Sequence, residues 1–199
     1  MVSIILLIVF GAVGVYLLAY SKMKSASLKA FALNRGLSYK EKDDGTLAKE
    51  LNEKFGIEEY GRVRSFAQIG DLVSDGEVTL LRCTELLDMN LYRKAAVTHS
   101  SRFAVTFIVP ETVKLFFKID DKGKYYYIEP TDKDVAQDEH FIKIKPVLDS
   151  HLPQHWLSAT FSNGRAIIYL MPLVVGNEKE EDFEYLFKTA GEIKKTLSK

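Results

Sequence analysis

The strongest constraint on this chain is an uncharged apolar run at its beginning. Residues Val2–Tyr20 contain no charged side chain and are rich in Leu, Ile, Val and Phe. As a helix rising about 1.5 Å per residue, the run would extend roughly 28 Å, which is close to the ~30 Å hydrocarbon thickness of a bilayer. These residue types also favour insertion near the membrane centre. The run therefore predicts a transmembrane anchor with the lipid bilayer as its partner.

The charges that follow the run set its expected orientation. No Lys or Arg precedes it, whereas four basic residues lie from Lys22 to Arg35, ahead of the first acidic residue, Glu41. Segments rich in Lys and Arg stay on the cytoplasmic side of a membrane. A cleaved signal peptide is disfavoured, because the run is too long and lacks both a basic start and a small-x-small cleavage site. We therefore expect a single-pass inner-membrane protein with its N-terminus outside and its C-terminal domain in the cytoplasm.

Residues 21–35 predict a short amphipathic helix next to the anchor. Leu28, Phe31 and Ala32 share one apolar face, and Gly36 follows where a helix would end. Two interpretations stay open: the first helix of the folded domain, or a surface helix lying on anionic lipid. The expected organisation is an anchor at 2–20, a juxtamembrane amphipathic helix at 21–35 and one soluble domain at 36–199.

The middle of the chain reads as β-strands. From Arg62 to Lys145 apolar and polar residues alternate in several runs, the last of them Phe141–Lys145. Asp120–Gly123 predicts a hairpin turn, and the acidic stretch Thr131–His140 is expected to be a solvated loop. Because the connections are too short for crossover helices, we expect an antiparallel meander.

Helix signals stand on both sides of these strands. Thr46–Phe55 has helical apolar spacing and follows two aspartates, Asp43 and Asp44, that suit capping rather than cation binding. The last helix is expected to begin at Asn177, with an apolar stripe that needs a sheet to cover. The predicted fold class is α+β: an N-terminal transmembrane helix, then a soluble domain with a mainly antiparallel sheet and a packed C-terminal helix.

Composition excludes one class of partner. Basic and acidic residues both number 27, so the chain carries no formal net charge, whereas a nucleic-acid binder normally shows a basic excess. The run Tyr125–Tyr127 is therefore interpreted as packing rather than as a stacking platform for bases. The single cysteine, Cys83, sits in an apolar run and is expected to be a buried structural thiol.

No catalytic constellation stands out, and no catalytic residue is assigned. His151 and His155 have the spacing of helical metal ligands, but Pro153 between them opposes a helix, so no metal is expected. His99 and Ser100 pair an imidazole with a hydroxyl, yet neighbouring strand residues point to opposite faces. Glycine-rich phosphate loops are missing, so no cofactor is expected.

The segment Glu85–Lys94 interrupts the strand pattern. It fits either a loop crossing the sheet edge or an exposed contact surface, and the sequence leaves both open.

The stretch Phe31–Tyr39, which contains Ala-x-x-x-Gly-Leu-x-Tyr after an apolar span, carries a resemblance. Together with the β-rich centre and the C-terminal helix, it resembles uncharacterised single-pass bacterial membrane proteins with an N-terminal anchor and a β-rich domain. The resemblance implies this layout and lends no activity and no functional residue.

The leading functional hypothesis is non-enzymatic. It is a membrane-tethered cytoplasmic domain that binds a protein partner, or acts as a scaffold or sensor at the membrane surface. The alternative is a membrane-anchored hydrolase whose site is assembled from distant segments, which an enclosed pocket with converging His, Ser and acidic groups would support.

Overall fold

The computed structural model describes residues 27–55, 58–59, 62–89, 97–120, 122–127, 135–150, 156–171 and 179–199. The strands are β1 (Ser38–Lys42), β2 (Glu58–Glu59), β3 (Arg62–Ser74), β4 (Val78–Met89), β5 (Val97–Ile108), β6 (Leu115–Ile119), β7 (Tyr125–Tyr127), β8 (Trp156–Ser162) and β9 (Arg165–Met171). The helices are α2 (Thr46–Phe55), α3 (Glu139–Ser150) and α4 (Glu180–Leu197), with a 3-10 turn η1 (Val135–Gln137) and a helical stretch at 27–34, called here the first helix.

All nine strands join one antiparallel sheet. Its order is β1-β3-β4-β5-β9-β8-β6-β7, and β2 pairs with the beginning of β3. The strands from β3 to β5 form the expected meander, but beyond β5 the meander prediction is wrong, because β9 lies beside β5 and β8 separates β9 from β6. A helix, α3, occupies the connection between β7 and β8 that was expected to be too short for one.

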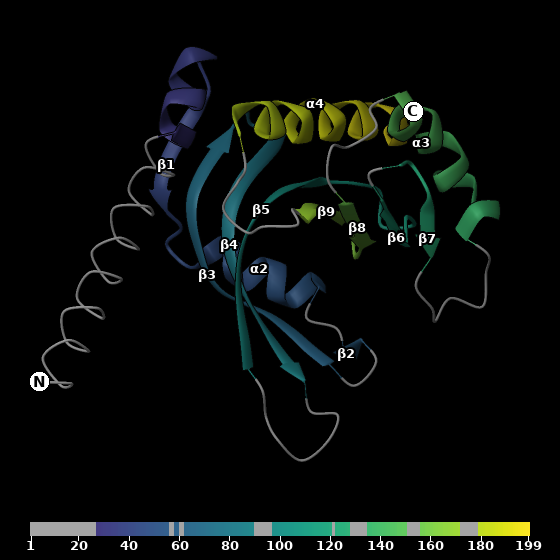
Figure 1. Cartoon of the computed structure of the whole chain (residues 1–199), viewed down its shortest axis with the longest axis horizontal. Helices are drawn as coiled ribbons and strands as arrows, with labels where there is room; N and C mark the ends of the chain where they lie inside the picture. Colours follow the sequence, from purple (N-terminus) through teal and green to yellow (C-terminus); the bar gives the residue numbers. More distant parts are fainter. Residues whose placement is uncertain are drawn as a thin grey trace, which may run out of the picture.

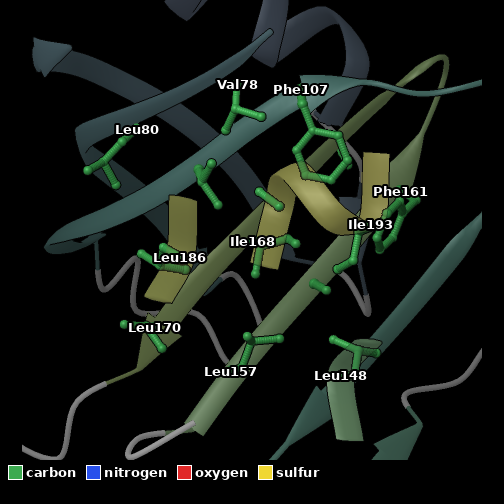
Figure 2. Close-up of a cluster of buried hydrophobic side chains, with 14 of the residues drawn as sticks. Val78, Leu80, Phe107, Leu148, Leu157, Phe161, Ile168, Leu170, Leu186 and Ile193 are labelled. Atoms are coloured by element: carbon green, nitrogen blue, oxygen red, sulfur yellow. The ribbon is translucent and has the colours of Figure 1, made fainter. Parts of the chain in front are cut away.

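The larger core lies between one face of the sheet and three helical segments. In Figure 1, α4 runs along this side of the sheet, with α3 at one end. Figure 2 shows side chains from β4, β5, β8 and β9 gathered around Leu186 and Ile193 of α4 and Leu148 of α3. Phe183 of α4 also packs against Phe31 and Phe103, with ring centroids 5.9 and 4.8 Å away. Burial of these apolar surfaces is the main stabilising contribution of this layer.

The opposite face of the sheet packs on α2. Leu51 and Phe55 of this helix are buried against Phe66, Leu81 and Tyr169 of three different strands. Cys83 is 1% exposed in the same cluster, so the prediction of a buried thiol is confirmed. The fold therefore has three layers, with the sheet in the middle and helices on both faces (Figure 1).

The first helix belongs to the domain. Its apolar face is buried in the larger core, with Leu28 and Phe31 at most 1% exposed. Just after it, Arg35 binds Glu180 and Glu184 of α4 at 2.8 and 2.9 Å, and its guanidinium lies 4.3 Å from the Phe31 ring centroid. The face that would have to enter a lipid surface is therefore occupied by the protein's own core.

The helix at Thr46–Phe55 is confirmed with the predicted bounds. The strand predicted at Phe141–Lys145 is wrong, because this segment lies inside α3. Phe141, Ile144 and Leu148 are spaced for one buried helical face, and Asp138 starts the helix by accepting hydrogen bonds from the N–H groups of His140 and Phe141. The end of the predicted loop Thr131–His140 is therefore a helix cap.

The predicted C-terminal helix is also present, and a β-hairpin precedes it. α4 begins after Lys179 rather than at Asn177, which lies outside the described residues, and the side chain of Asp182 accepts the Lys179 N–H at 2.7 Å. Between β8 and β9, Asn163 and Gly164 adopt φ angles of 50° and 79°. A two-residue hairpin turn of type I′ requires positive φ at both of these positions.

The membrane predictions need correction. Within the described ranges no helix is both long and apolar enough to cross a membrane, and the predicted span Val2–Tyr20 lies outside those ranges. A span needs about 20 mostly apolar residues, whereas the 18 residues of α4 include acidic groups in the first turn and basic groups in the last. The predicted transmembrane helix, single-pass membrane protein and inner-membrane location are therefore not supported. The fold is an α+β domain with an antiparallel sheet and a C-terminal helix.

Candidate functional site

Of the residues singled out for catalysis or metal binding, the structure places only the backbone of His99 and Ser100. They are consecutive in β5, opposite Leu86 and Glu85 of β4. His151 and His155 lie outside the described residues. Among the residues that the structure describes, no three His, Cys, Asp or Glu side chains are grouped as metal ligands would be.

A shallow depression of about 610 Å³ lies at the beginning of α2, lined in part by Asp43 and Asp44. Both carboxylates already serve the helix: Asp43 accepts the N–H groups of Gly45 and Ala48, and Asp44 accepts that of Thr46. Hydrogen bonds from the Thr46 side chain and backbone, together with Lys40, hold the pKa of the Asp44 carboxyl below its usual range. The predicted capping role is confirmed, and the caps use the groups that an ion would need.

The aromatic run in β7 contributes packing through Tyr125. Its ring centroid lies 5.4 Å from that of Phe141, and its hydroxyl donates to Asp149 at 2.7 Å. Partial burial acts to raise the pKa of the Asp149 carboxyl, but hydrogen bonds from Lys145 and Tyr125 outweigh it and leave the pKa below its usual range. Tyr125 is thus held by the protein's own groups, as the packing interpretation predicts.

A buried polar cluster lies where β3 bulges. The register with β4 passes from Gly70 opposite Arg82 to Leu72 opposite Leu81, so Asp71 is the extra residue. Its side chain is 1% exposed and binds Arg82 at 2.7 Å and the Tyr39 hydroxyl at 2.6 Å. A Cβ on Gly70 would lie in ordinary contact, 3.4 Å from the Arg82 guanidinium. The cluster is satisfied internally.

The outer edge of β3 is covered along its length. β1 pairs with residues 70–74 and β2 with residues 62–63. Between them, the Asn52 side chain accepts the Phe66 N–H at 2.7 Å and donates to the Phe66 carbonyl at 3.1 Å, and the Asp43 N–H donates to the Ile69 carbonyl. An amide side chain therefore takes the place of a strand in the gap between two short strands.

The corresponding edge of β5 is different. β5 pairs with β4 from Val97 to Phe107 without a register shift, but it pairs with β9 only from Ala104 to Ile108. For residues 97–102, the side away from β4 is paired with no strand in the described part of the chain. Phe103, next to the Ala104–Tyr169 pair, faces β9. We call the unpaired backbone of residues 97–102 the β5 edge. In Figure 1, β3, β4 and β5 extend together past α2, with β2 and β5 on opposite sides of the ribbon.

The register shows which groups line the β5 edge. Just past the strand end, the Val109 N–H donates to the Gly164 carbonyl at 3.0 Å, on the β9 side. Successive strand residues direct their N–H and C=O groups to alternate sides. The odd-numbered residues of β5 therefore direct these groups away from β4, and within the β5 edge they are Val97, His99 and Ser101.

Other strand edges in the described ranges carry features that oppose pairing. β1, at one end of the sheet, has the charged run Lys40, Glu41 and Lys42. β7, at the other end, is three residues long, and β2 has only two. Lysines and short length are the usual protections of an edge. Residues 97–102 contain no Pro or Lys, and Arg102 is their one formally charged residue, so the β5 edge has few of these protections.

The segment Glu85–Lys94 is partly settled by the same register. Glu85–Met89 belong to β4 and pair with β3, and Glu85–Asp88 also pair with β5, so the interrupted strand expected there is wrong. Residues 90–96 lie outside the described residues. The β5 edge could not be predicted from the sequence. The residue pattern of a strand shows which of its faces is buried, but which strands lie beside it depends on the topology of the sheet.

Comparisons with protein-family models, curated proteins and solved structures give no match to this chain. The expected resemblance to single-pass bacterial membrane proteins is therefore corrected: no family relation is found, and the layout on which it rested included a span outside the described residues.

Proposed function

We propose that this protein is a binding module that takes up an extended segment of a protein partner by β-strand addition at the β5 edge. The observation that carries the proposal is the unequal pairing of β5, with one side paired to β4 throughout residues 97–102 and the other side paired with no described strand there. In strand addition, backbone hydrogen bonds supply affinity and alternate side chains supply specificity.

The backbone sets a limit on the affinity. Three residues offer one N–H and one C=O each, and each hydrogen bond formed contributes about 0.5–1.5 kcal/mol net. Association itself costs about 4–15 kcal/mol. Backbone pairing alone therefore gives weak binding, and a partner needs side-chain contacts beside the strand for more. This suits a reversible interaction.

The test uses proline at neighbouring positions. Ser101→Pro removes an N–H that faces the β5 edge, whereas Ser100→Pro removes one that pairs with β4. Displayed peptides of about seven to ten residues are selected on the wild-type chain. Those that bind should lose at least about tenfold in affinity for Ser101→Pro, while hydrogen exchange shows its β4–β5 amides still protected.

Ser100→Pro serves as the matched comparison, because it should destabilise the sheet itself. Selected peptides that bind Ser101→Pro as well as the wild type would rule out strand addition at this edge. Slow exchange of the amides at 97, 99 and 101 in the peptide-free monomer would also rule it out, because the edge would then be paired within its own chain.

A further inference from the structure

The turn between β8 and β9 places a side-chain amide directly before a glycine, at Asn163–Gly164. Asn163 is exposed, and among the residues that the structure describes it is the one non-glycine residue with a positive φ. We infer that Asn163–Gly164 is a site of spontaneous deamidation whose rate is controlled by the docking of this turn on α2. The inference is independent of strand addition at the β5 edge.

The reaction needs only the chain and water. The backbone nitrogen of Gly164 attacks the side-chain carbonyl carbon (Cγ) of Asn163, the bond from Cγ to the side-chain nitrogen breaks, and ammonia leaves with the proton from the glycine nitrogen. Water then opens the cyclic imide at either of its carbonyl carbons, which yields aspartate or isoaspartate. Glycine suits the first step because it has no Cβ to hinder its nitrogen, and asparagine is among the thermolabile residues.

The amide that must move is held by α2. The Asn163 side-chain nitrogen donates to the Lys54 carbonyl at 3.0 Å, and the Lys54 ammonium donates to the Asn163 carbonyl at 2.6 Å. Lys54 lies in the last turn of α2, so the amide satisfies one of the carbonyl groups that a helix end leaves without an intrahelical partner. Ring closure turns Cγ toward the Gly164 nitrogen and takes the amide away from the Lys54 carbonyl.

The attacking residue is held as well. The Val109 N–H donates to the Gly164 carbonyl at 3.0 Å, and a Cβ placed on Gly164 would lie 3.2 Å from Cγ of Glu111. Gly164 is therefore fixed by hydrogen bonding and by close packing. Deamidation should proceed from a locally opened turn, so its rate should follow the population of that open state.

The products would loosen the end of α2. A carboxylate at residue 163 has no N–H to donate to the Lys54 carbonyl, and negative charge is unfavourable at a helix C-terminus, although the Lys54 ammonium offsets part of it. Isoaspartate also adds a carbon atom to the main chain, which does not fit a two-residue hairpin turn. The site thus couples chemical ageing of the chain to the attachment of α2.

The test follows deamidation of the full chain at neutral pH by mass spectrometry of its digests. The chain denatured in guanidinium chloride gives the rate without docking, and Asn163 in the folded chain should react at least about tenfold more slowly. Lys54→Ala removes the ammonium contact and should raise the folded-state rate. Lys49→Ala, on the exposed side of the same helix, is the matched control and should leave it unchanged. Asn52, which precedes Glu53, serves as the internal reference.

A second variant loosens the same attachment from another point. Glu50→Gln weakens the ion pair of α2 with Arg165, whose atoms lie 2.7 Å apart, and should also raise the rate at Asn163. Hydrogen exchange of the β4–β5 amides, equally slow in all variants, would show that the faster reaction comes from the turn and not from global unfolding.

The two parts of the inference fail separately. No deamidation of Asn163 in the denatured chain would overturn the site itself. Equal rates in the folded and denatured chains would overturn its control by docking, as would folded Lys54→Ala and Glu50→Gln chains that react no faster than Lys49→Ala.

Discussion

Asp71 illustrates how one inserted residue organises a polar cluster inside an apolar fold. The bulge turns its carboxylate toward Arg82 and Tyr39, from the strands on either side of β3. A buried charge is tolerated only when it is paired and hydrogen-bonded. Both conditions hold here, so the cluster links β1, β3 and β4 by side chains as well as by backbone.

Replacing Asp71 alone should therefore cost more than replacing the pair. Asp71→Ala leaves the partly buried Arg82 guanidinium without this partner, and we expect a loss of about 2–4 kcal/mol in the free energy of unfolding. The double change Asp71→Leu with Arg82→Met should recover part of it, because no charge is then left buried. Urea unfolding of the single and double variants measures both values. If the free-energy losses of the single changes simply added up in the double variant, Asp71 and Arg82 would not be coupled.

A second residue makes stability depend on alkaline pH. Burial raises the pKa of the Tyr185 hydroxyl above its ordinary value of 10.0, and the neighbouring Thr189 hydroxyl opposes this by less. Above pH ~10 the unfolded chain loses this proton while the folded chain keeps it. The stabilising contribution is thus complete below pH ~10 and is lost as pH rises beyond it.

Tyr185→Phe should remove that part of the alkaline loss. The urea midpoints of the wild type and the variant, measured across about pH 9 to 11, should show a smaller decline for the variant. Parallel declines would show that the folded and unfolded states ionise Tyr185 alike.

Among the elements, α2 depends on contacts at both of its sides. Asn52 pairs with the backbone of Phe66 in β3, whereas Glu50 binds Arg165 of β9 at 2.7 Å. Lys54 and Asn163 also exchange hydrogen bonds through each other's carbonyl oxygens. The helix thus bridges two strands that are separated by β4 and β5 in the sheet.

Asn52→Ala should destabilise the domain through the strand rather than through the helix. Alanine is the better helix former, yet it leaves the N–H and C=O of Phe66 without the Asn52 amide, at a cost of about 1–3 kcal/mol for each buried group. Lys49→Ala, on the exposed side of the same helix, is the control and should change stability by less than about 0.5 kcal/mol. Equal effects in thermal or urea unfolding would contradict the role assigned to Asn52.

Elements whose structure is determined by their own residues could be predicted from the sequence. Elements whose structure depends on contacts with distant parts of the chain could not. Thr46–Phe55 carries its own caps and apolar spacing, and the Asn163–Gly164 turn carries its own backbone preference. By contrast, Phe141–Lys145 fits an alternating strand over five residues. Its helical identity depends on the Asp138 cap and on burial against α4, which only the longer window shows.

The whole molecule is a sheet with differently protected edges, and the sequence could not reveal this. Charged residues in β1 are visible in the sequence, but which strand lies beside β5 depends on a pairing between β5 and β9 some sixty residues apart. The same limit applies to the candidate site. His99 and Ser100 were considered for their side chains, whereas the proposed function uses the backbone around them.

The first helix provides a test at the scale of the domain. Phe31 is 1% exposed and packs on Phe183, whereas Leu33 is 67% exposed. Phe31→Ala should lower the free energy of unfolding by about 3–5 kcal/mol. Leu33→Ala, the control on the same helix, should change it by less than about 0.5 kcal/mol. Similar small losses for both variants would show that this helix is not part of the folded unit.

The two-sided attachment of α2 also bears on how the chain matures during synthesis. Only the two-residue β2 separates α2 from β3 in the chain, so the contact between Asn52 and Phe66 spans only 14 residues and can form early. The contact between Lys54 and Asn163 spans 109 residues and must await nearly the whole chain. Until β9 emerges from the ribosome, the apolar face of α2 lacks Ile167 and Tyr169. A nascent chain halted before β9 should therefore expose that face and bind chaperones, whereas the completed chain should not.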